Sequence, residues 1–358
     1  MGAVRVLITG AGAPGARGTI YALRHNPEGR DVEIVGTDVN TDVVGRYLVD
    51  RFYRVPPAES AEYVPSLIQV CRIEKITLVL PQTTREAQVL ASVRDDLVRQ
   101  GIRVAVSGLH ALSIANDKGR LVEAFAKLGL PYPRYRLARS EEELIDAAEA
   151  LGYPTVPVVV KPPVSSGMRG LRILREDAWD VRRFLGEKPD GVETSLIDLV
   201  KVLRRGSQWP TLLVTEYLPG PEYTVDAFRG KDIFVAIPRI RRAIRSGITF
   251  IAEIEQRSDL EAYSKQAAEA LGLEYAFGFQ FKLDAEGVPK VLECNPRIQG
   301  TMVASVFAGY NIPWFTVREL MGMPMRREEV RNEAVQGVKF YRYWGGVGVV
   351  DDTPLGDI

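Results

Sequence analysis

The first third of the chain alternates short apolar runs with amphipathic stretches, and this alternation limits the possible folds more than any other feature. Strand-like runs occupy residues 4–9, 32–37, 76–80 and 103–107, and helix-like stretches occupy about 15–25, 61–73 and 85–100. Strands that alternate with helices predict a parallel sheet with helices packed on it. Ligands of such sheets bind beyond the carboxyl ends of the strands. We therefore expect a Rossmann-like domain at the N-terminus.

A glycine-rich loop follows the first of these strands. Gly10, Gly12 and Gly15 have the G-x-G-x-x-G spacing, and Asp38 stands at the end of the second strand. This arrangement meets the description of a dinucleotide-binding unit. Any tight turn from a strand to a helix also favours glycine. An NAD(P)-dependent oxidoreductase is therefore one function to consider, although no catalytic histidine or tyrosine is evident.

The middle of the chain contains two lysines next to structural boundaries. Lys118 follows Asn116 and Asp117, which are good N-cap residues for the helix that comes next. Taken alone, Lys118 is typical of a solvated first-turn residue. Lys161 ends a predicted strand, residues 156–161, just before a loop of small residues. It would place a positive charge at the base of that loop.

The loop after Lys161 contains Ser165, Ser166 and Gly167 and leads into another predicted strand, residues 171–174. Backbone N–H groups in such a loop can cradle phosphates. The pattern is not a P-loop, because no G-K-[ST] precedes a helix. We expect the loop to close over a ligand, as mobile active-site loops do. A hairpin tip without a ligand is the alternative.

Residues 279–301 are predicted to form a β-hairpin. Side chains alternate between the two faces of a strand, so Glu293 and Asn295 point the same way. If Gln280 pairs near Glu293, the three side chains form an oxygen-rich patch beside Arg297. Mg²⁺ typically takes one or two carboxylates together with substrate phosphates, and arginine suits a phosphoryl group. An ordinary polar surface hairpin would show the same pattern, so the hairpin alone leaves both interpretations open.

The other predicted elements complete a mixed α/β chain. Helices are expected at 141–151, 178–185, 194–205, 260–271 and 316–321, and strands at 211–217, 223–229, 231–238, 248–255 and 336–343. The basic cluster at residues 239–245 is expected between two strands, where it is either a solvated face or the wall of a cleft for an anion. The tail, residues 345–358, is expected to be irregular.

Composition excludes several classes of function. The 46 lysines and arginines balance the 46 aspartates and glutamates, so net charge gives no support for a nucleic-acid partner. No apolar run approaches the roughly 18 residues that span a bilayer. The two cysteines, Cys71 and Cys294, form no metal-spacing motif, which favours a reducing cytoplasm. Cys294 lies between two candidate ligands in sequence and should face the core.

Taken together, Lys118, Lys161, the loop and the E-x-N-x-R string from Glu293 to Arg297 resemble the ATP-grasp carboxylate–amine ligases. The resemblance covers nearly the whole chain in the same order, and it is strongest to a single synthetase unit of the carbamoyl-phosphate synthase large subunit. It implies a Rossmann-like pre-ATP-grasp domain followed by an ATP-grasp fold of two α+β subdomains. The implied domains are residues 1–115, a small subdomain with the phosphate loop at 116–220, and a large subdomain with the metal site at 221–358.

The resemblance also implies a role for each matched residue. ATP would be bound by Lys118, Lys161, Ser165, Ser166, Gly167, Glu216, Tyr217, Leu218 and Glu222, of which Glu216 to Leu218 form the adenine hinge and Glu222 meets the ribose. Mg²⁺, or Mn²⁺ in its place, would be bound by Gln280, Glu293 and Asn295. Arg297 would steady an acyl phosphate, with Lys161 as a second catalytic cation.

The implied reaction joins a small-molecule carboxylate to an amine. The carboxylate attacks the γ-phosphate of ATP, and the amine attacks the resulting acyl phosphate to give an amide, ADP and phosphate. A homodimer is a reasonable expectation for such a chain. Two rivals remain, the oxidoreductase above and a non-catalytic nucleotide-binding subunit that keeps the fold.

Overall fold

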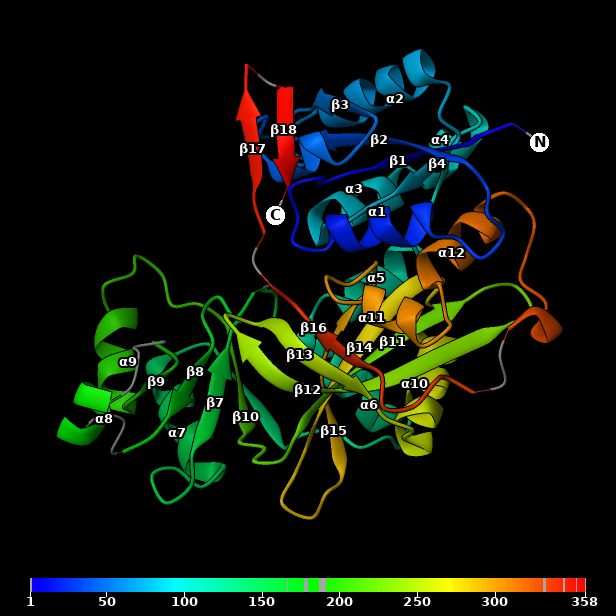
Figure 1. Ribbon diagram of the computed structural model, residues 1–358. Coiled ribbons are helices and arrows are strands. Elements are labelled where there is room, and N and C mark those ends of the chain that lie inside the picture. The colour runs from blue at the N-terminus through cyan, green and yellow to red at the C-terminus, as the bar shows by residue number, and fades with distance from the viewer. Residues whose placement is uncertain are drawn as a thin grey trace.

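The computed structural model describes residues 2–165, 167–176, 180–186, 191–330, 333–343, 345–351 and 353–357. Within them, the strands form a parallel sheet near the N-terminus, a second and a third mixed or antiparallel sheet, and a short hairpin at the C-terminus. Figure 1 shows the first sheet and its helices above the third sheet, with the second sheet to one side. The mixed α/β fold expected from the sequence is confirmed.

The first sheet is parallel throughout, with the strand order β3-β2-β1-β4-β5. Its strands are β1 (Val4–Ile8), β2 (Val32–Asp38), β3 (Arg51–Arg54), β4 (Leu78–Leu80) and β5 (Arg103–Val104). Its helices are α1 (Ala16–Arg24), η1 (Val44–Tyr47), α2 (Tyr63–Glu74), α3 (Thr84–Ser92), α4 (Arg94–Arg99) and α5 (Leu109–Ala115). Alternate residues of β1 enter two different cores, because a strand turns successive side chains to opposite faces.

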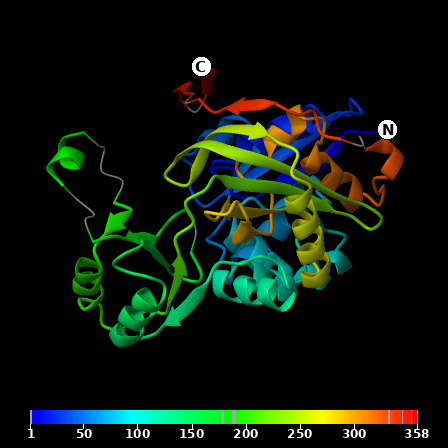
Figure 2. The same cartoon turned by 90° about the horizontal axis from the view of Figure 1, so that it is seen from below.

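The second sheet has the order β6-β10-β7-β8-β9 and is antiparallel except between β8 and β9. Its strands are β6 (Tyr135–Ala138), β7 (Val158–Lys161), β8 (Arg172–Leu174), β9 (Glu193–Thr194) and β10 (Leu212–Glu216). The helices of this part are α7 (Glu141–Ala150), α8 (Val181–Gly186) and α9 (Leu196–Leu203). Figure 2 shows this sheet and its helices projecting away from the rest of the molecule, so it forms a separate lobe with its own core.

The third sheet is antiparallel, with the order β15-β14-β11-β12-β13-β16. Its strands are β11 (Glu222–Arg229), β12 (Phe234–Arg245), β13 (Ile248–Ile254), β14 (Tyr275–Leu283), β15 (Pro289–Asn295) and β16 (Lys339–Tyr341). Helices α6 (Lys118–Lys127) and α10 (Ser258–Leu271) share a core with one face, and α11 (Val303–Phe307), α12 (Ile312–Leu320) and η2 (Arg327–Glu329) follow β15 in the chain. The other face shares a core with α12 and the first sheet.

Aromatic side chains of β14 anchor the face that α6 covers. Phe277, Phe279 and Phe281 are fully buried, and Phe125 of α6 packs on Phe279 with ring centroids 5.8 Å apart. Burial of one such side chain stabilises a fold by roughly 1.5–3 kcal/mol. Because odd-numbered residues of β14 enter this core, Gln280 is turned to the opposite face. The packing of the phenylalanines therefore sets which face carries the polar residues.

Three sequence expectations about these elements are wrong, and two elements were not expected. The helix expected at 85–100 is broken at Val93 into α3 and α4. Strand β3 and helix α5 were not expected, because neither segment carries a clear strand or cap pattern. The basic cluster lies within β12 instead of between two strands. The tail is not irregular, since β17 (Val347–Val350) pairs with β18 (Thr353–Asp357).

Candidate functional site

Lys118 is held beside the loop that follows β7. Asp117 caps helix α6, which makes Lys118 the first helical residue. The backbone N–H of Lys118 donates to the carbonyl of Pro163 over 2.9 Å, and its Nζ donates to the carbonyl of Ser165 over 2.8 Å. The same Nζ lies 3.4 Å from Oε2 of Glu293. With 8% of its surface exposed, Lys118 is not the solvated residue that its helix position alone suggested.

Lys161 is a second buried lysine at the same place. It is the last residue of β7 and only 6% exposed, and within the described residues its Nζ has no hydrogen bond or ion pair. Burial and the neighbouring charge of Lys118 lower the pKa of Lys161 to about 8, against the opposing fields of Glu293 and Glu222. Two buried cations that repel each other form a site with a net attraction for an anion.

The hairpin of β14 and β15 has the register that the sequence predicted. Gln280 pairs with Glu293, and Gly278 pairs with Asn295. A bulge between these pairs and Val291 adds one residue to β15, so Val291 and Cys294 both enter the core that α6 covers. Glu293 and Asn295 remain together on the opposite face, where Nδ2 of Asn295 donates to Oε1 of Glu293 over 3.3 Å.

The oxygen-rich patch fits a hard divalent cation that also binds phosphates. In the described residues, no three His, Cys, Asp or Glu side chains converge as a metal cluster. The patch offers one carboxylate, Glu293, and the amide oxygens of Gln280 and Asn295. These amide oxygens now accept from arginines, Gln280 from Arg241 over 3.3 Å and Asn295 from Arg297 over 3.5 Å. Mg²⁺ held by few carboxylates keeps waters and phosphates as its other ligands.

Arg297 connects the patch with the first domain. Its Nε donates to Oγ1 of Thr84, the first residue of α3, over 3.3 Å, and its Nη1 donates to the carbonyl of Ile298 over 2.9 Å. Burial lowers the pKa of Arg297, and the fields of Glu293 and Glu86 oppose that shift. The guanidinium therefore lies between the patch and the carboxyl edge of the first sheet, where ligands of such sheets bind.

The loop after Lys161 lies over the turn between β12 and β13. Gly167 and Met168 both have positive φ, +63° and +61°. A Cβ at Gly247 in that turn would lie 3.1 Å from Cγ of Met168, so the two segments are in close contact. Ser165 contributes its carbonyl to Lys118. Ser166, which was expected to bind ATP, lies outside the described residues.

The basic cluster of β12 is largely neutralised by carboxylates. Its ion pairs join Arg239 to Asp226, Arg241 to Glu222, and Arg242 to Glu253 and Glu255. Arg241 also donates to Oγ1 of Thr249 over 2.8 Å and to the carbonyl of Gly247 over 2.6 Å. Only Arg241 among these three reaches the patch, because it also contacts Gln280. The cluster is therefore not a continuous wall for an anion.

In the predicted adenine hinge, residues 216–218, the side chain of Glu216 is hydrogen-bonded within the described chain, and the backbone of the next two residues is not. Glu216 accepts from Nε of Arg134 over 2.9 Å and from Nζ of Lys290 over 2.7 Å. Burial would raise the pKa of Glu216, but the hydrogen bonds from Lys290 and Arg134 outweigh it and lower the pKa. Glu216 thus ties β10 to its neighbours. No backbone hydrogen bond joins Tyr217 or Leu218 to the described part of the chain, so their backbone polar groups are unpaired there.

The glycine-rich turn of the first sheet is closed by the protein itself. The N–H of Gly12 donates to Oδ2 of Asp38 over 2.8 Å. A Cβ at Gly15 would lie 2.8 Å from Cα of Gly300, so that glycine allows two backbones to approach. Gly10 has a φ of +57° and is needed for the turn itself. All three glycines therefore have packing or turn roles, and the amide that a pyrophosphate would use is taken.

Sequence reasoning missed three residues that lie against the site. Gln299 and Asp226 are buried and joined by a hydrogen bond of 3.4 Å, and Thr84 contacts Arg297. The one available signal was Gly278, an isolated glycine within an aromatic strand, which often marks a close approach by another group. A Cβ at Gly278 would overlap the amide of Gln299.

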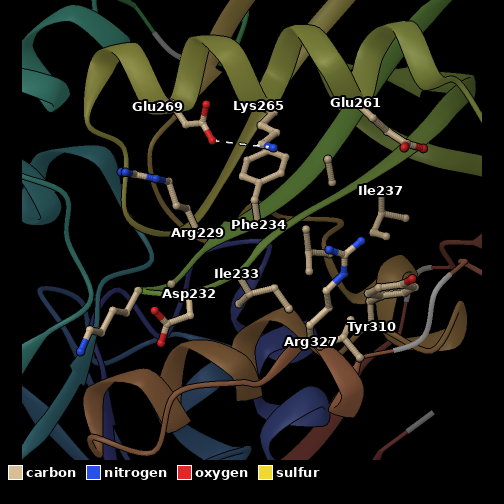
Figure 3. A pocket seen from close by; sticks show the side chains of 15 residues that line it. Arg229, Asp232, Ile233, Phe234, Ile237, Glu261, Lys265, Glu269, Tyr310 and Arg327 are labelled. Carbon is tan, nitrogen blue, oxygen red and sulfur yellow. Dashed lines mark ion pairs between the residues drawn. The ribbon is translucent and has the colours of Figure 1, made fainter.

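A separate cavity of about 550 Å³ lies between helix α10 and the start of β12. Figure 3 shows Glu261, Lys265 and Glu269 of α10 on one side of it and Arg327 on another. Its lining carries both signs of charge and includes none of the residues expected to bind ATP or metal. The cavity is therefore distinct from the cluster of Lys118, Lys161 and Glu293.

Two family models match separate parts of the chain. Residues 6–105 match the N-terminal domain of PylC-like proteins. Residues 208–341 match a family described as ATP-grasp in the biosynthetic pathway with Ter operon. The second match includes the hinge and the hairpin but neither Lys118 nor Lys161. Neither match therefore bears on Lys118 or Lys161, whose positions come from the structure alone.

Solved structures with the same fold include enzymes complexed with ADP. The biotin carboxylase domain of Hydrogenobacter thermophilus 2-oxoglutarate carboxylase, in complex with MgADP, ADP and bicarbonate, is 18% identical with a TM-score of 0.69, over 91% of this chain and 72% of that one. N5-carboxyaminoimidazole synthetase from Staphylococcus aureus, complexed with ADP, is 15% identical with a TM-score of 0.67, over 90% of this chain and 78% of that one. L-amino acid ligase from Bacillus licheniformis is 14% identical with a TM-score of 0.65, over 93% of this chain and 77% of that one.

Among the described residues, no helix combines the length and the apolar character that a membrane span requires.

Proposed function

We propose that this chain, which carries an ATP-grasp domain behind a PylC-like N-terminal domain, is an ATP-dependent carboxylate–amine ligase. One observation carries the proposal. Lys118 and Lys161, both buried and far apart in sequence, converge on Glu293, with Nζ of Lys118 3.4 Å from its carboxylate. A triphosphate with its metal ion would need such cations and such a carboxylate side by side.

The proposed reaction is a phosphoryl transfer followed by an acyl transfer. A substrate carboxylate oxygen attacks the γ-phosphorus of ATP, and the bond between that phosphorus and the β,γ-bridging oxygen breaks to release ADP. The amine then attacks the carbonyl carbon of the acyl phosphate, phosphate leaves, and the amine loses a proton. Positioning and charge neutralisation supply the catalysis, so no protein nucleophile is needed.

The residues of the site divide these tasks. Lys118 and Lys161 hold phosphate oxygens, and Arg297 steadies the acyl phosphate at the edge of the first sheet. Glu293, Gln280 and Asn295 would hold Mg²⁺, or Mn²⁺, which neutralises the charge of the β- and γ-phosphates. The loop with Ser165, Ser166 and Gly167 covers the phosphates in this proposal.

The base and ribose lie at the other end of the nucleotide. The open backbone of Tyr217 and Leu218 pairs with the adenine, while Glu216 supports the hinge through Arg134 and Lys290. Glu222 takes the ribose hydroxyls, for which it must share its carboxylate with Arg241. Arg241 keeps its other partners in that case, Thr249 and Gly247.

The proposal extends to the surroundings of the enzyme. We divide the chain into residues 1–115, 116–220 and 221–358, and we place it in the cytoplasm as a homodimer. Its partners are ATP, a small-molecule carboxylate and an amine. The described residues with their balanced charge offer no argument for nucleic acid.

A screen of ADP release tests the proposal. The carboxylate panel includes bicarbonate and L-amino acids, because the similar structures include a bicarbonate complex and an L-amino acid ligase. We expect ADP release that requires one carboxylate, one amine and Mg²⁺, together with an amide product. The Glu293→Ala variant should keep its fold and lose ADP formation. The control, Glu286→Ala in the turn of the same hairpin, should keep both its fold and ADP formation. Normal turnover by Glu293→Ala would overturn the metal assignment.

A further inference from the structure

A buried ion pair crosses the centre of the third sheet, on the face that carries the oxygen-rich patch. Asp226 of β11 has no exposed surface, and Arg239 of β12 is 2% exposed. Nε of Arg239 donates to Oδ2 of Asp226 over 2.8 Å, and Nη2 donates to Oδ1 over 3.2 Å. Asp226 pairs in register with Gly278, which in turn pairs with Asn295 of the patch.

This ion pair is not explained by stability. Within the described residues, Nη1 of Arg239 is buried without a hydrogen-bond partner, and so is Oγ1 of Thr224, which faces Arg239 across the strands. A buried donor left unsatisfied lowers stability. Replacing a buried ion pair by apolar residues of similar volume is often neutral or stabilising. Stability alone therefore gives no reason for these two charges, whereas a buried ion pair can fix one arrangement of the neighbouring groups.

The group that Asp226 fixes is the side-chain amide of Gln299. Nε2 of Gln299 donates to Oδ1 of Asp226 over 3.4 Å. An ionised carboxylate only accepts hydrogen bonds, so it selects the NH₂ end of the amide. The amide lies over Gly278, where any side chain would overlap it. The absence of a side chain at Gly278 and the charge of Asp226 thus define one position for Gln299.

Gln299 belongs to the short loop, residues 297–301, that begins with Arg297. The carbonyl of Gln299 accepts from the N–H of Met302 over 3.1 Å, and the N–H of Arg297 donates to the carbonyl of Asn295 over 2.8 Å. On its other side the loop packs against the glycine-rich turn, through Gly300 and Gly15. Gln299 is therefore one of the side chains that tie this loop to the sheet beneath it, together with Arg342, whose Nη2 donates to the carbonyl of Gly300 over 2.7 Å.

We propose that Asp226 and Arg239 are positioning residues that act through Gln299 to hold the 297–301 loop, and with it Arg297, against the oxygen-rich patch. Arg239 orients the carboxylate of Asp226, Asp226 orients the amide of Gln299, and Gln299 fixes the loop. The catalytic consequence rests on the proposed function, because it depends on Arg297 meeting the acyl phosphate. The structural consequence, a loop fixed by a buried ion pair, does not.

The double variant Asp226→Leu/Arg239→Met tests the proposal by removing both charges while keeping most of the volume. Hydrogen–deuterium exchange of the amides of Arg297 and Met302 is measured in the ligand-free protein. We expect both amides to exchange about tenfold faster, the change that corresponds to one lost hydrogen bond, while the melting temperature is kept. Unchanged exchange at both amides in a folded double variant overturns the proposal.

A second variant covers the case in which the double variant does not fold. Gln299→Leu leaves the ion pair intact and removes only its link to the loop, so it should give the same increase in exchange at Arg297 and Met302. The matched control, Arg5→Gln/Glu33→Gln, removes a 2.9 Å ion pair in the first sheet and should leave the loop unchanged. Equal exchange in Gln299→Leu and wild type contradicts the proposal.

Kinetics then separate this proposal from the ligase proposal. Given a substrate pair from the screen, the double variant should have about a hundredfold lower kcat with an unchanged KM for ATP, because a misplacement of about 1 Å has such an effect. A purely structural pair would leave kcat unchanged, which would contradict the positioning role. If the wild type turns over no substrate, the ligase proposal fails while the exchange measurement still decides this one.

Discussion

Two glycine-containing loops follow strands in this chain, and they differ in whether the protein itself pairs the polar groups beside them. The turn after β1 carries Gly10, Gly12 and Gly15, and the loop after β7 carries Gly167 and Gly170 behind Lys161. In the first, the N–H of Gly12 is bound by Asp38 over 2.8 Å. In the second, a buried lysine has no partner in the described residues and a second lysine contacts the loop.

The difference shows that glycine spacing alone does not define a phosphate site. The first turn has the better-known spacing, but the protein's own carboxylate takes its amide, and Gly300 packs on Gly15. The second loop has no recognised spacing, but it lies beside Lys161, whose Nζ has no hydrogen bond or ion pair within the described residues. Backbone donors bind an anion only where they are free and where the field favours negative charge.

The largest expected effect comes from removing the charge at the second loop. Lys161→Ala should reduce ADP formation at least about a hundredfold, as loss of a group that stabilises transferred charge does. Lys201→Ala, which removes an exposed lysine paired with Asp198 in the same lobe, is the control and should retain activity. Steady-state ADP release measures both. Similar losses of ADP release in the two variants would contradict a special role for Lys161 and its loop.

A substitution in the first turn, after β1, should change the stability of the protein and leave nucleotide binding unchanged. Gly15→Ala places a Cβ 2.8 Å from Cα of Gly300, and such overpacking typically destabilises by about 1–3 kcal/mol. Gly108→Ala is the matched control, because no atom lies within 4 Å of its Cβ. Urea titration gives the free energy of unfolding. A change in nucleotide affinity without a loss of stability would contradict the packing role of Gly15.

The pH dependence of nucleotide binding should report Lys161. Its pKa is lowered to about 8 in the free protein, so the binding-competent charged form predominates below pH 8 and is lost above it. The affinity for Mg-ATP should therefore fall by up to about tenfold per pH unit above 8. The sign for stability is opposite, because the unfolded chain binds the proton more tightly and the ligand-free protein gains stability as pH rises above 8. Lys161→Arg should flatten the binding profile, and isothermal titration between pH 7 and 9 is the measurement.

The smallest effect is expected at Asp38. Asp38→Ala removes two exposed hydrogen bonds, which Asp38 accepts from the N–H of Gly12 and from the N–H of Asn40, and each contributes about 0.5–1.5 kcal/mol to stability. We expect unchanged Mg-ATP binding and no NAD(H) binding in this variant. Tight NAD(H) binding by wild type or variant, measured by fluorescence titration, would mean that the first turn is the functional one.

Local patterns predicted much of the fold and of the candidate site. Period-two alternation placed Glu293 and Asn295 on one face, and the pairing of Gln280 with Glu293 is confirmed because the buried phenylalanines of β14 leave one register. The inward direction of Cys294 is also confirmed. These features depend on residues close in sequence, so the sequence contains them.

Features that depend on distant contacts were not predictable. The break at Val93 divides a stretch whose apolar periodicity continues, and the bulge that turns Val291 inward leaves no local mark. Glu216 was expected in the adenine hinge, but nothing near it in sequence indicated that Arg134 and Lys290 hold its carboxylate. The roles of the site residues stay predictions until they are tested by binding and turnover.

Thermal unfolding with Mg-ATP, with ATP and EDTA, and with NAD(H) tests the central claim most directly. The account predicts that the melting temperature rises with Mg-ATP, because Lys118, Lys161 and the patch at Glu293 bind the nucleotide and its metal ion together. It predicts little or no rise with ATP and EDTA and none with NAD(H). A clear rise with NAD(H) and none with Mg-ATP would contradict it.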